Sequence, residues 1–235
     1  MAFLTAEWRD LVMLNWQVPV PHLAGLVPRG TELDAWQGRT LVSVVGFRFL
    51  NTRVLGRRMW GHVNFEEVNL RFYVKRECHG ELRRGVVFVK EIVPRRCIAL
   101  LARRFYNENY IAAPMSHAIE RSSEEMRVRY AWQLGGRMHS VSARCAGSCA
   151  EMLVGSPQEF IAEHYWGYCR QRDGSTLEYQ VAHPRWHIAE VHDCQFDCDV
   201  ASVYGPEWVE PLAGPPVSAF LADGSAVEVG FGQRF

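Results

Sequence analysis

The sequence RRGVVFVKEIVPRRCIALLARRFYNENYIAAPMSH, at residues 83–117, carries the most informative pattern for the predicted fold. Its apolar run at 86–93 has the length and the β-branched content of a buried strand, and Pro94 follows as a turn. Residues 95–107 predict a basic helix, because their apolar positions recur at the spacing of a helix packed on a sheet. A second strand is expected to start near Tyr110.

Two charged residues, Lys90 and Glu91, lie side by side within that apolar run. Side chains alternate between the faces of a strand, so Lys90 is expected on one face and Glu91 on the other. The expected companions of Lys90 are Val86, Phe88 and Ile92. A charge in such a strand is costly unless it is paired, neutralised or used. Two interpretations remain open. Glu91 forms a structural ion pair, with Arg71 or with an arginine of the helix, or one of the two charged residues faces a ligand and has a displaced pKa.

The strand expected at 65–76 carries polar side chains on one face. That face holds Asn69, Arg71, Tyr73 and Lys75, while the other face is apolar. One interpretation is a polar side that faces solvent. The other is the polar interior wall of a barrel, where asparagine, arginine and tyrosine side chains orient a small carboxylate or carbonyl ligand.

The rest of the chain predicts further strands and two more helices. Residues 3–16 are expected to form an amphipathic helix, and the capping pattern at 156–159 predicts a helix that runs to about Cys169. The two glycines at 135–136 predict a hairpin turn. The remaining strands are expected at 40–49, 126–134, 137–145, 176–183 and 186–192. With no internal repeat and no linker, we expect one β-rich α+β domain over residues 1–235.

Composition excludes several classes of function. The 235 residues include 26 basic and 26 acidic side chains, so the formal net charge is zero. This balance argues against a nucleic-acid groove and against a polybasic membrane anchor. The start of the chain lacks a signal-peptide pattern, and no apolar stretch of about 18 residues predicts a membrane span. We therefore expect a cytoplasmic protein with reduced cysteines, for which an oligomeric state is possible.

A cluster of possible metal ligands lies near the C-terminal end of the sequence. It comprises His183, His187, His192, Cys194 and Cys198. The segment contains no tight Cys-x-x-Cys pair, and residues four apart in an extended chain do not converge on one ion. The chain also lacks a phosphate loop and a dinucleotide fingerprint. We therefore expect neither a bound metal nor a cofactor.

Several long motifs resemble the YqjF-like family of uncharacterised bacterial proteins. They are GTELDAWQG (30–38), VSVVGFRF (42–49), FEEVNLRFYV (65–74), RRGVVFVKEIVPR (83–95), YNENYIAAPMSH (106–117) and EYQVAHPRW (178–186). That family is similar to the acetoacetate-decarboxylase-like superfamily. The resemblance implies a β-barrel or curved antiparallel sheet with a central cavity and a few covering helices.

Decarboxylases of that superfamily use a lysine Schiff base, within a motif that corresponds to residues 102–111 of this chain. The lysine pair of the motif falls on Tyr110 and Ile111, and its glutamate falls on Arg104. None of these side chains forms an imine with a keto acid. The resemblance therefore implies that the fold has been kept without the decarboxylase chemistry.

Taken together, the sequence predicts a protein that binds a small organic carboxylate or carbonyl compound in a barrel cavity. The candidate wall consists of Asn69, Arg71, Tyr73, Lys90, Glu91 and Tyr110, with Arg71 as the anion-binding group. One alternative is an enzyme that uses the same cavity, by acid–base chemistry from Glu91 and Tyr110 or by imine chemistry at Lys90. Another is a protein-interaction module that uses the eight tryptophans at an interface.

Overall fold

A computed structural model describes residues 2–58, 61–95 and 109–235. The strands are β1 (Leu4–Gln17), β2 (Glu32–Leu33), β3 (Leu41–Val54), β4 (Arg57–Arg58), β5 (Phe65–Cys78), β6 (Glu81–Val93), β7 (Tyr110–Ala112), β8 (Met115–Arg121), β9 (Glu125–Leu134), β10 (Arg137–Ala146), β11 (Ala150–Glu151), β12 (Trp166–Arg170), β13 (Thr176–Ala182), β14 (His187–Asp197), β15 (Ser218–Val229) and β16 (Gln233–Arg234). The helices are α1 (Val20–Ala24), α3 (Pro157–Ala162), α4 (Val200–Val203) and a 3-10 turn at Pro206–Trp208. Within the described ranges, no helix has the length and apolar character needed to cross a membrane.

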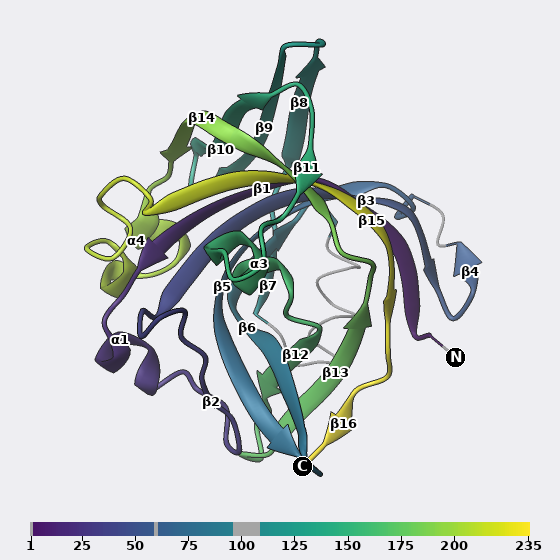
Figure 1. The fold of residues 1–235 in the computed structure, drawn as a ribbon, viewed down its shortest axis with the longest axis vertical. Coiled ribbons are helices and arrows are strands. Elements are labelled where there is room, and N and C mark those ends of the chain that lie inside the picture. Colours follow the sequence, from purple (N-terminus) through teal and green to yellow (C-terminus); the bar gives the residue numbers. More distant parts are fainter. Residues whose placement is uncertain (1, 59–60, 96–108) are drawn as a thin grey trace.

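The strands form one strongly curved sheet. Its path runs β13–β12–β6–β5–β3–β1–β15, and β13 also pairs with β15, which closes the path into a ring. Figure 1 shows β1, β3 and β15 arching over β5, β6, β12 and β13. Most pairs are antiparallel, but β6 pairs in parallel with both β12 and β7. The sheet is therefore mixed rather than purely antiparallel, and it encloses an interior in a β-rich α+β fold.

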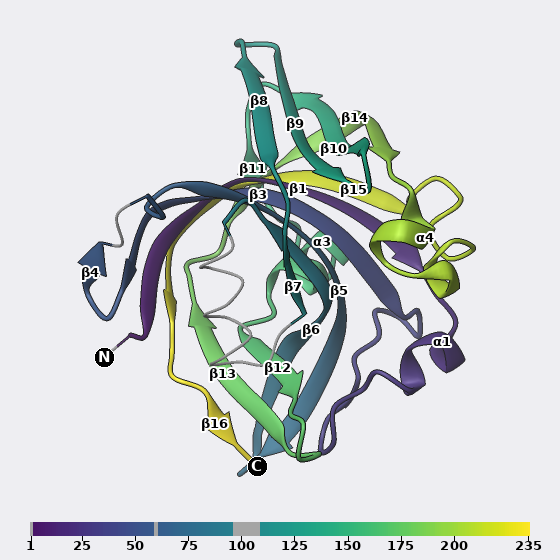
Figure 2. The ribbon, with the colours of Figure 1, turned by 180° about the vertical axis from the view of Figure 1, so that it is seen from behind.

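Each face of the central strands is covered by a different set of side chains. The inner face carries Met13, Val45, Phe47 and Phe220, which pack around the enclosed interior with the short helix α3. The outer face carries Val12, Val44, Leu70 and Phe72, which pack against Tyr130 and Val141 of the β9–β10 hairpin. The strands β8, β9 and β10 continue from β14 and stand out beyond the arch (Figure 2). Two apolar layers thus fix the position of β1, β3 and β5.

The helix predicted at 3–16 is wrong, because these residues form strand β1. From Leu11 to Trp16 every side chain is buried, since both faces of β1 are covered. Such a strand loses the alternation of polar and apolar residues. An irregularity between Arg9 and Val12 disturbs the pattern further, with Asp10 at a φ of 57°.

The structure confirms the predicted hairpin and two predicted strands, and it shortens one predicted helix. The hairpin around Gly135 and Gly136 is confirmed, with both glycines at positive φ between β9 and β10. The strands expected at 40–49 and 65–76 are confirmed within β3 and β5. The helix starting at Ser156 is confirmed at its cap but ends at Ala162, and the chain then forms β12. The helix expected at 95–107 lies outside the described residues, apart from Arg95.

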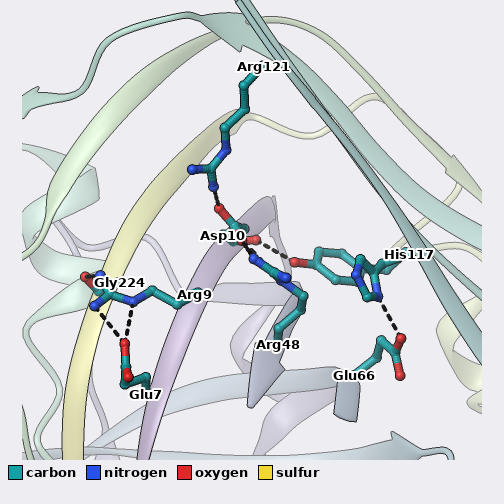
Figure 3. Close-up of polar contacts among 9 residues, drawn as sticks. Glu7, Arg9, Asp10, Arg48, Glu66, His117, Arg121 and Gly224 are labelled. Carbon is teal, nitrogen blue, oxygen red and sulfur yellow. Dashed lines mark hydrogen bonds and ion pairs between the residues drawn. The ribbon is translucent and has the colours of Figure 1, made fainter. Parts of the chain in front are cut away.

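Asp10 links the outer strands to the central sheet. Its carboxylate accepts hydrogen bonds from Arg48 of β3 and Arg121 of β8, and both arginines point toward it in Figure 3. The Tyr130 hydroxyl of β9 donates to the Asp10 carbonyl oxygen at 2.9 Å. The Asp10 side chain is only 2% exposed. Because the bulge in β1 leaves Asp10 out of the regular ladder, one residue can receive partners from three strands.

Candidate functional site

A cavity of about 390 Å³ lies inside the curved sheet. Strands on opposite sides of the ring contribute to its wall, and most of the wall is apolar or aromatic. Its polar side chains among the described residues include Thr52, His62, Glu67, Asn69, Arg71, Glu91, Tyr110 and His164. This volume lies within the range of small-molecule sites, which are mostly apolar with a few convergent polar groups.

A β-bulge in β6 decides which of its side chains reach the cavity. Lys90 stands opposite Leu70, yet the next residue of β5, Arg71, stands opposite Phe88, so Val89 is the extra residue. Asn109 donates a hydrogen bond to the Val89 carbonyl oxygen at 3.0 Å. Beyond the extra residue, the alternation of the strand is inverted.

The bulge overturns the predicted faces of β6. Phe88 and Glu91 both line the cavity, although strict alternation placed them on opposite faces. Lys90 lies instead on the outer side, where its Nζ donates a hydrogen bond to the carbonyl oxygen of Val203. Burial lowers the pKa of Lys90, and the charge of Glu207 opposes that shift. No signal in the sequence marks the bulge, because Val89 has the residue type of a regular strand.

Three predicted residues and one missed residue form the polar centre of the cavity. Asn69 stands directly opposite Glu91 across β5 and β6. The missed residue, Glu67, accepts hydrogen bonds from Asn69 Nδ2 at 2.9 Å and from the Tyr110 hydroxyl at 3.3 Å. Glu67 precedes Asn69 by two positions, so strand alternation alone places both side chains on the face that the sequence singled out.

Glu67 has an unusual protonation equilibrium. Burial raises its pKa from 4.5 to about 7, while the hydrogen bonds from Asn69 and Tyr110 and the charge of Arg71 act in the opposite direction. Desolvation therefore outweighs the groups that favour the carboxylate. At neutral pH, Glu67 can both donate and accept a proton.

Arg71 is a buried cation at the wall of the cavity. Its side chain is close to fully buried, with the residue 9% exposed. Its guanidinium contacts Met13 Sδ at 4.0 Å and lies 5.8 Å from the ring centroid of Tyr73. Among the described residues it has no ion pair, and its Nε has no hydrogen-bond partner. The pair expected between Arg71 and Glu91 is thus absent from the described residues.

A second polar group, which sequence analysis missed, reaches the cavity from the side of β12. His164 lines the cavity, and its Nε2 lies 3.2 Å from Asp34 Oδ2. Asp34 also pairs with Arg84 at 3.1 Å. Burial lowers the pKa of His164, although the hydrogen bond with Asp34 and the charge of Asp34 oppose the shift. Asp34 and His164 are 130 positions apart, and no local pattern connects them.

The six predicted ligand-binding residues thus divide into two sets. Asn69, Arg71, Glu91 and Tyr110 line the cavity. Tyr73 and Lys90 do not line the cavity. The Tyr73 hydroxyl forms a hydrogen bond with the Ser43 hydroxyl, and Lys90 lies on the outer side of β6. The other lysine, Lys75, pairs with Glu32 at 3.3 Å, so neither lysine of the chain faces the cavity.

The possible metal ligands near the C-terminal end do not converge on one point in the structure. His183 stacks on Trp186, with ring centroids 4.1 Å apart, and Cys194 lies near the middle of β14. In the part of the chain that the structure describes, no three histidine, cysteine or acidic side chains come close enough to hold a metal ion. The absence of zinc from the protein stays a prediction.

Comparison with solved structures identifies the fold. The chain is similar to acetoacetate decarboxylase from Legionella pneumophila, with a TM-score of 0.68, 9% identity and coverage of 99% of this chain and 86% of the other. It is also similar to the enduracididine biosynthesis enzyme MppR complexed with pyruvate, with a TM-score of 0.67, 11% identity and coverage of 100% and 91%. At these identities the likeness shows an acetoacetate-decarboxylase-like fold and nothing further.

Comparison of sequences identifies the family. Over 114 residues the chain is 32% identical to the uncharacterized protein YqjF of Bacillus subtilis (strain 168), a match that covers 46% of this chain and 43% of YqjF. The chain therefore spans less than half the length of this curated relative. The family model of uncharacterized conserved proteins, DUF2071, matches residues 5–226. Because this match covers nearly the whole chain, the protein belongs to the DUF2071 family of uncharacterized conserved proteins.

Proposed function

We propose that the cavity binds a small organic carboxylate, with the guanidinium of Arg71 as its ionic partner. The observation that carries this proposal is the state of Arg71, which is buried at the cavity wall without an ion pair among the described residues. A buried charge is costly unless it is paired. A ligand carboxylate can supply the missing partner through two parallel hydrogen bonds to the planar guanidinium.

The surroundings of Arg71 support a ligand that carries one negative charge. Glu67 and Arg71 interact electrostatically, and the positive charge of Arg71 lowers the pKa of Glu67. When Glu67 is protonated, the pair carries a net positive charge that attracts an anion. Deprotonation of Glu67 neutralises the pair and removes that attraction. One fold neighbour, MppR, was solved in complex with pyruvate, a small carboxylate.

Calorimetric titration of the full chain with a panel of carboxylates, pyruvate included, tests the proposal. Arg71→Met keeps the length of the side chain and removes its charge, so it should weaken binding at least tenfold. Arg53→Met is the matched control, because Arg53 is exposed on β3 outside the cavity. Equal affinities of both variants and the parent protein would contradict an ionic role for Arg71.

A second candidate function is acid–base catalysis on a bound carbonyl compound. The observation in its favour is Glu67, whose pKa of about 7 suits proton transfer near neutral pH. In this reaction, Glu67 removes a proton from the carbon next to a carbonyl group, the electron pair moves to the carbonyl oxygen, and the proton returns to the same carbon. Hydrogen exchange of 2-keto acids in D2O, followed by NMR, measures this step. Glu67→Gln should abolish the exchange while leaving binding intact.

The interaction-module alternative has less support. Every tryptophan in the described ranges is buried or half-buried, and none belongs to the exposed large hydrophobic residues. A tryptophan-based interface needs such side chains at the surface.

A further inference from the structure

We infer that the ligand is a carboxylic acid with a long apolar body, rather than a short keto acid. This inference rests on the proposed carboxylate site at Arg71 and adds the part of the ligand that Arg71 does not contact. The reason lies in the distribution of polar groups along the cavity wall.

The polar groups that could hold a carboxylate gather at one place. Glu67, Asn69 and Arg71 follow one another on the inner face of β5, and Glu91 stands opposite Asn69. On the neighbouring strand β3, Val45 pairs with Asn69 and Phe47 pairs with Glu67. The polar centre therefore lies beside the middle of β3.

From that point the wall along β3 is aromatic. Phe47 and Phe49 both line the cavity, and Trp8 packs against them with ring centroids 5.3 and 5.7 Å away. Phe65 stacks on Phe49 at 4.6 Å with an interplanar angle of 12°. The phenylalanine rings of this wall offer no hydrogen bond to a second polar group of a ligand, and the exception on the wall is the Trp8 indole N–H, which is buried without a partner among the described residues. The wall offers apolar contact to a hydrocarbon chain, with a gain from each methylene that leaves water.

The apolar wall extends to the surface of the protein. Val54 and Leu55 line the cavity where β3 ends, and Leu55 is 50% exposed. Polar groups return on this wall at Thr52 and His62. From Val45 to Thr52 the extended chain covers about 23 Å, at roughly 3.3 Å per residue. A ligand anchored at Arg71 can thus run past the aromatic side chains toward the outer end.

A series of straight-chain acids from acetate to octadecanoate, titrated into the full chain, tests this inference. Each added methylene should lower the Kd by about three- to fourfold until the outer end is reached. Decanol, which has the same chain but no carboxylate, should bind at least tenfold more weakly than decanoate. Arg71→Met should remove most of that difference.

A variant at the outer end separates the body of the ligand from its carboxylate. Val54→Glu introduces a charge on the half-buried apolar wall, so it should weaken octadecanoate at least tenfold and leave butanoate unchanged. Arg53→Glu is the matched control, because it adds negative charge at the exposed neighbour of Val54.

The outcomes distinguish the inference from the proposed function. Equal affinity for short and long acids, still dependent on Arg71, would overturn the long apolar body and leave the carboxylate site standing. Equal affinity for an acid and the alcohol of the same chain length would overturn the carboxylate site. A panel in which no acid binds would overturn both.

Discussion

Lys90 Nζ donates a hydrogen bond to the carbonyl oxygen of Val203, on the side of β6 that faces away from the carboxylate of Glu91. The amine is therefore held outside the cavity. Lys75, the other lysine, is paired with Glu32. Imine chemistry inside the cavity would need an amine, and neither lysine supplies one there.

We accordingly predict that the protein does not decarboxylate acetoacetate and forms no imine in its cavity. Incubation with keto acids and aldehydes, followed by borohydride reduction and mass spectrometry, should show no adduct that depends on an intact cavity. Carbon dioxide release should stay at the uncatalysed rate, with a known decarboxylase as the positive control. Carbon dioxide release above the uncatalysed rate, or an adduct that a cavity substitution such as Arg71→Met abolishes, would contradict the prediction.

Glu67 gives the protein a pH-dependent stability that can be measured directly. Its pKa rises from 4.5 to about 7 on folding, so its stabilising contribution is complete below pH 4.5 and is lost as the pH rises through about 7. Glu67→Gln should therefore raise the free energy of unfolding at pH 8, by up to ~3 kcal/mol, and change it little at pH 4.5. Urea denaturation at the two pH values measures the difference.

The control for this experiment is Glu77→Gln, an exposed position on the same strand. It should alter stability by less than about 0.5 kcal/mol at either pH. A Glu67→Gln variant that is destabilised equally at both pH values would show that Glu67 acts through its hydrogen bonds alone.

The same protonation should govern ligand affinity. Below about pH 7 Glu67 is neutral, and the charge of Arg71 is available to a carboxylate. Affinity should then fall as the pH rises through 7, by up to about tenfold per unit if binding takes up one proton. In Glu67→Gln this dependence should disappear. Calorimetric titrations at pH 6 and pH 8 with the same carboxylate measure it, and a flat profile in the parent protein would be evidence against the coupling.

Substitution of Asp10 should lower the free energy of unfolding more than substitution of most other acidic residues. Asp10→Asn removes the buried charge that Arg48 and Arg121 share, so we expect a loss of about 3 kcal/mol in the free energy of unfolding. Asp197→Asn breaks the half-exposed pair with Arg137 and should cost less than about 0.5 kcal/mol. Similar denaturation midpoints for the two variants would mean that the buried contacts of Asp10 add little.

The protein should contain no stoichiometric zinc, because its histidine and cysteine spacings do not build a closed tetrahedral site. Elemental analysis of the purified protein checks this. About one zinc per chain, lost on replacement of Cys194 or His187, would refute it.

The sequence predicted the parts of the fold that depend on local chemistry. The double glycine at 135–136 and the strand 65–76 have patterns that neighbouring residues determine, and both were found. The strand β1 was missed because burial of both faces removes the alternation that identifies a strand.

The side chains around the cavity lie where the sequence predicts them when strand alternation holds, and elsewhere when it fails. Asn69 and Arg71 reach the cavity together, as two residues two positions apart on a regular strand should. The faces of β6 on which Lys90 and Glu91 lie, relative to Phe88, are the reverse of those predicted. The cause is a bulge that depends on pairing between strands. The contact of His164 with Asp34 depends on the closure of the sheet, which no window of sequence contains.

The extra residue in β6 also bears on how relatives of this chain should be compared. In a relative whose β6 has the same length but no bulge, Val89 would pair in the regular ladder, and Lys90 would lie on the same face as Phe88. Whether Val89 is accommodated as a bulge, more than the identity of the charged residues, then decides whether the interior presents an amine or a carboxylate. Two relatives with the same Lys-Glu pair would present different groups to the cavity if one had this bulge and the other did not.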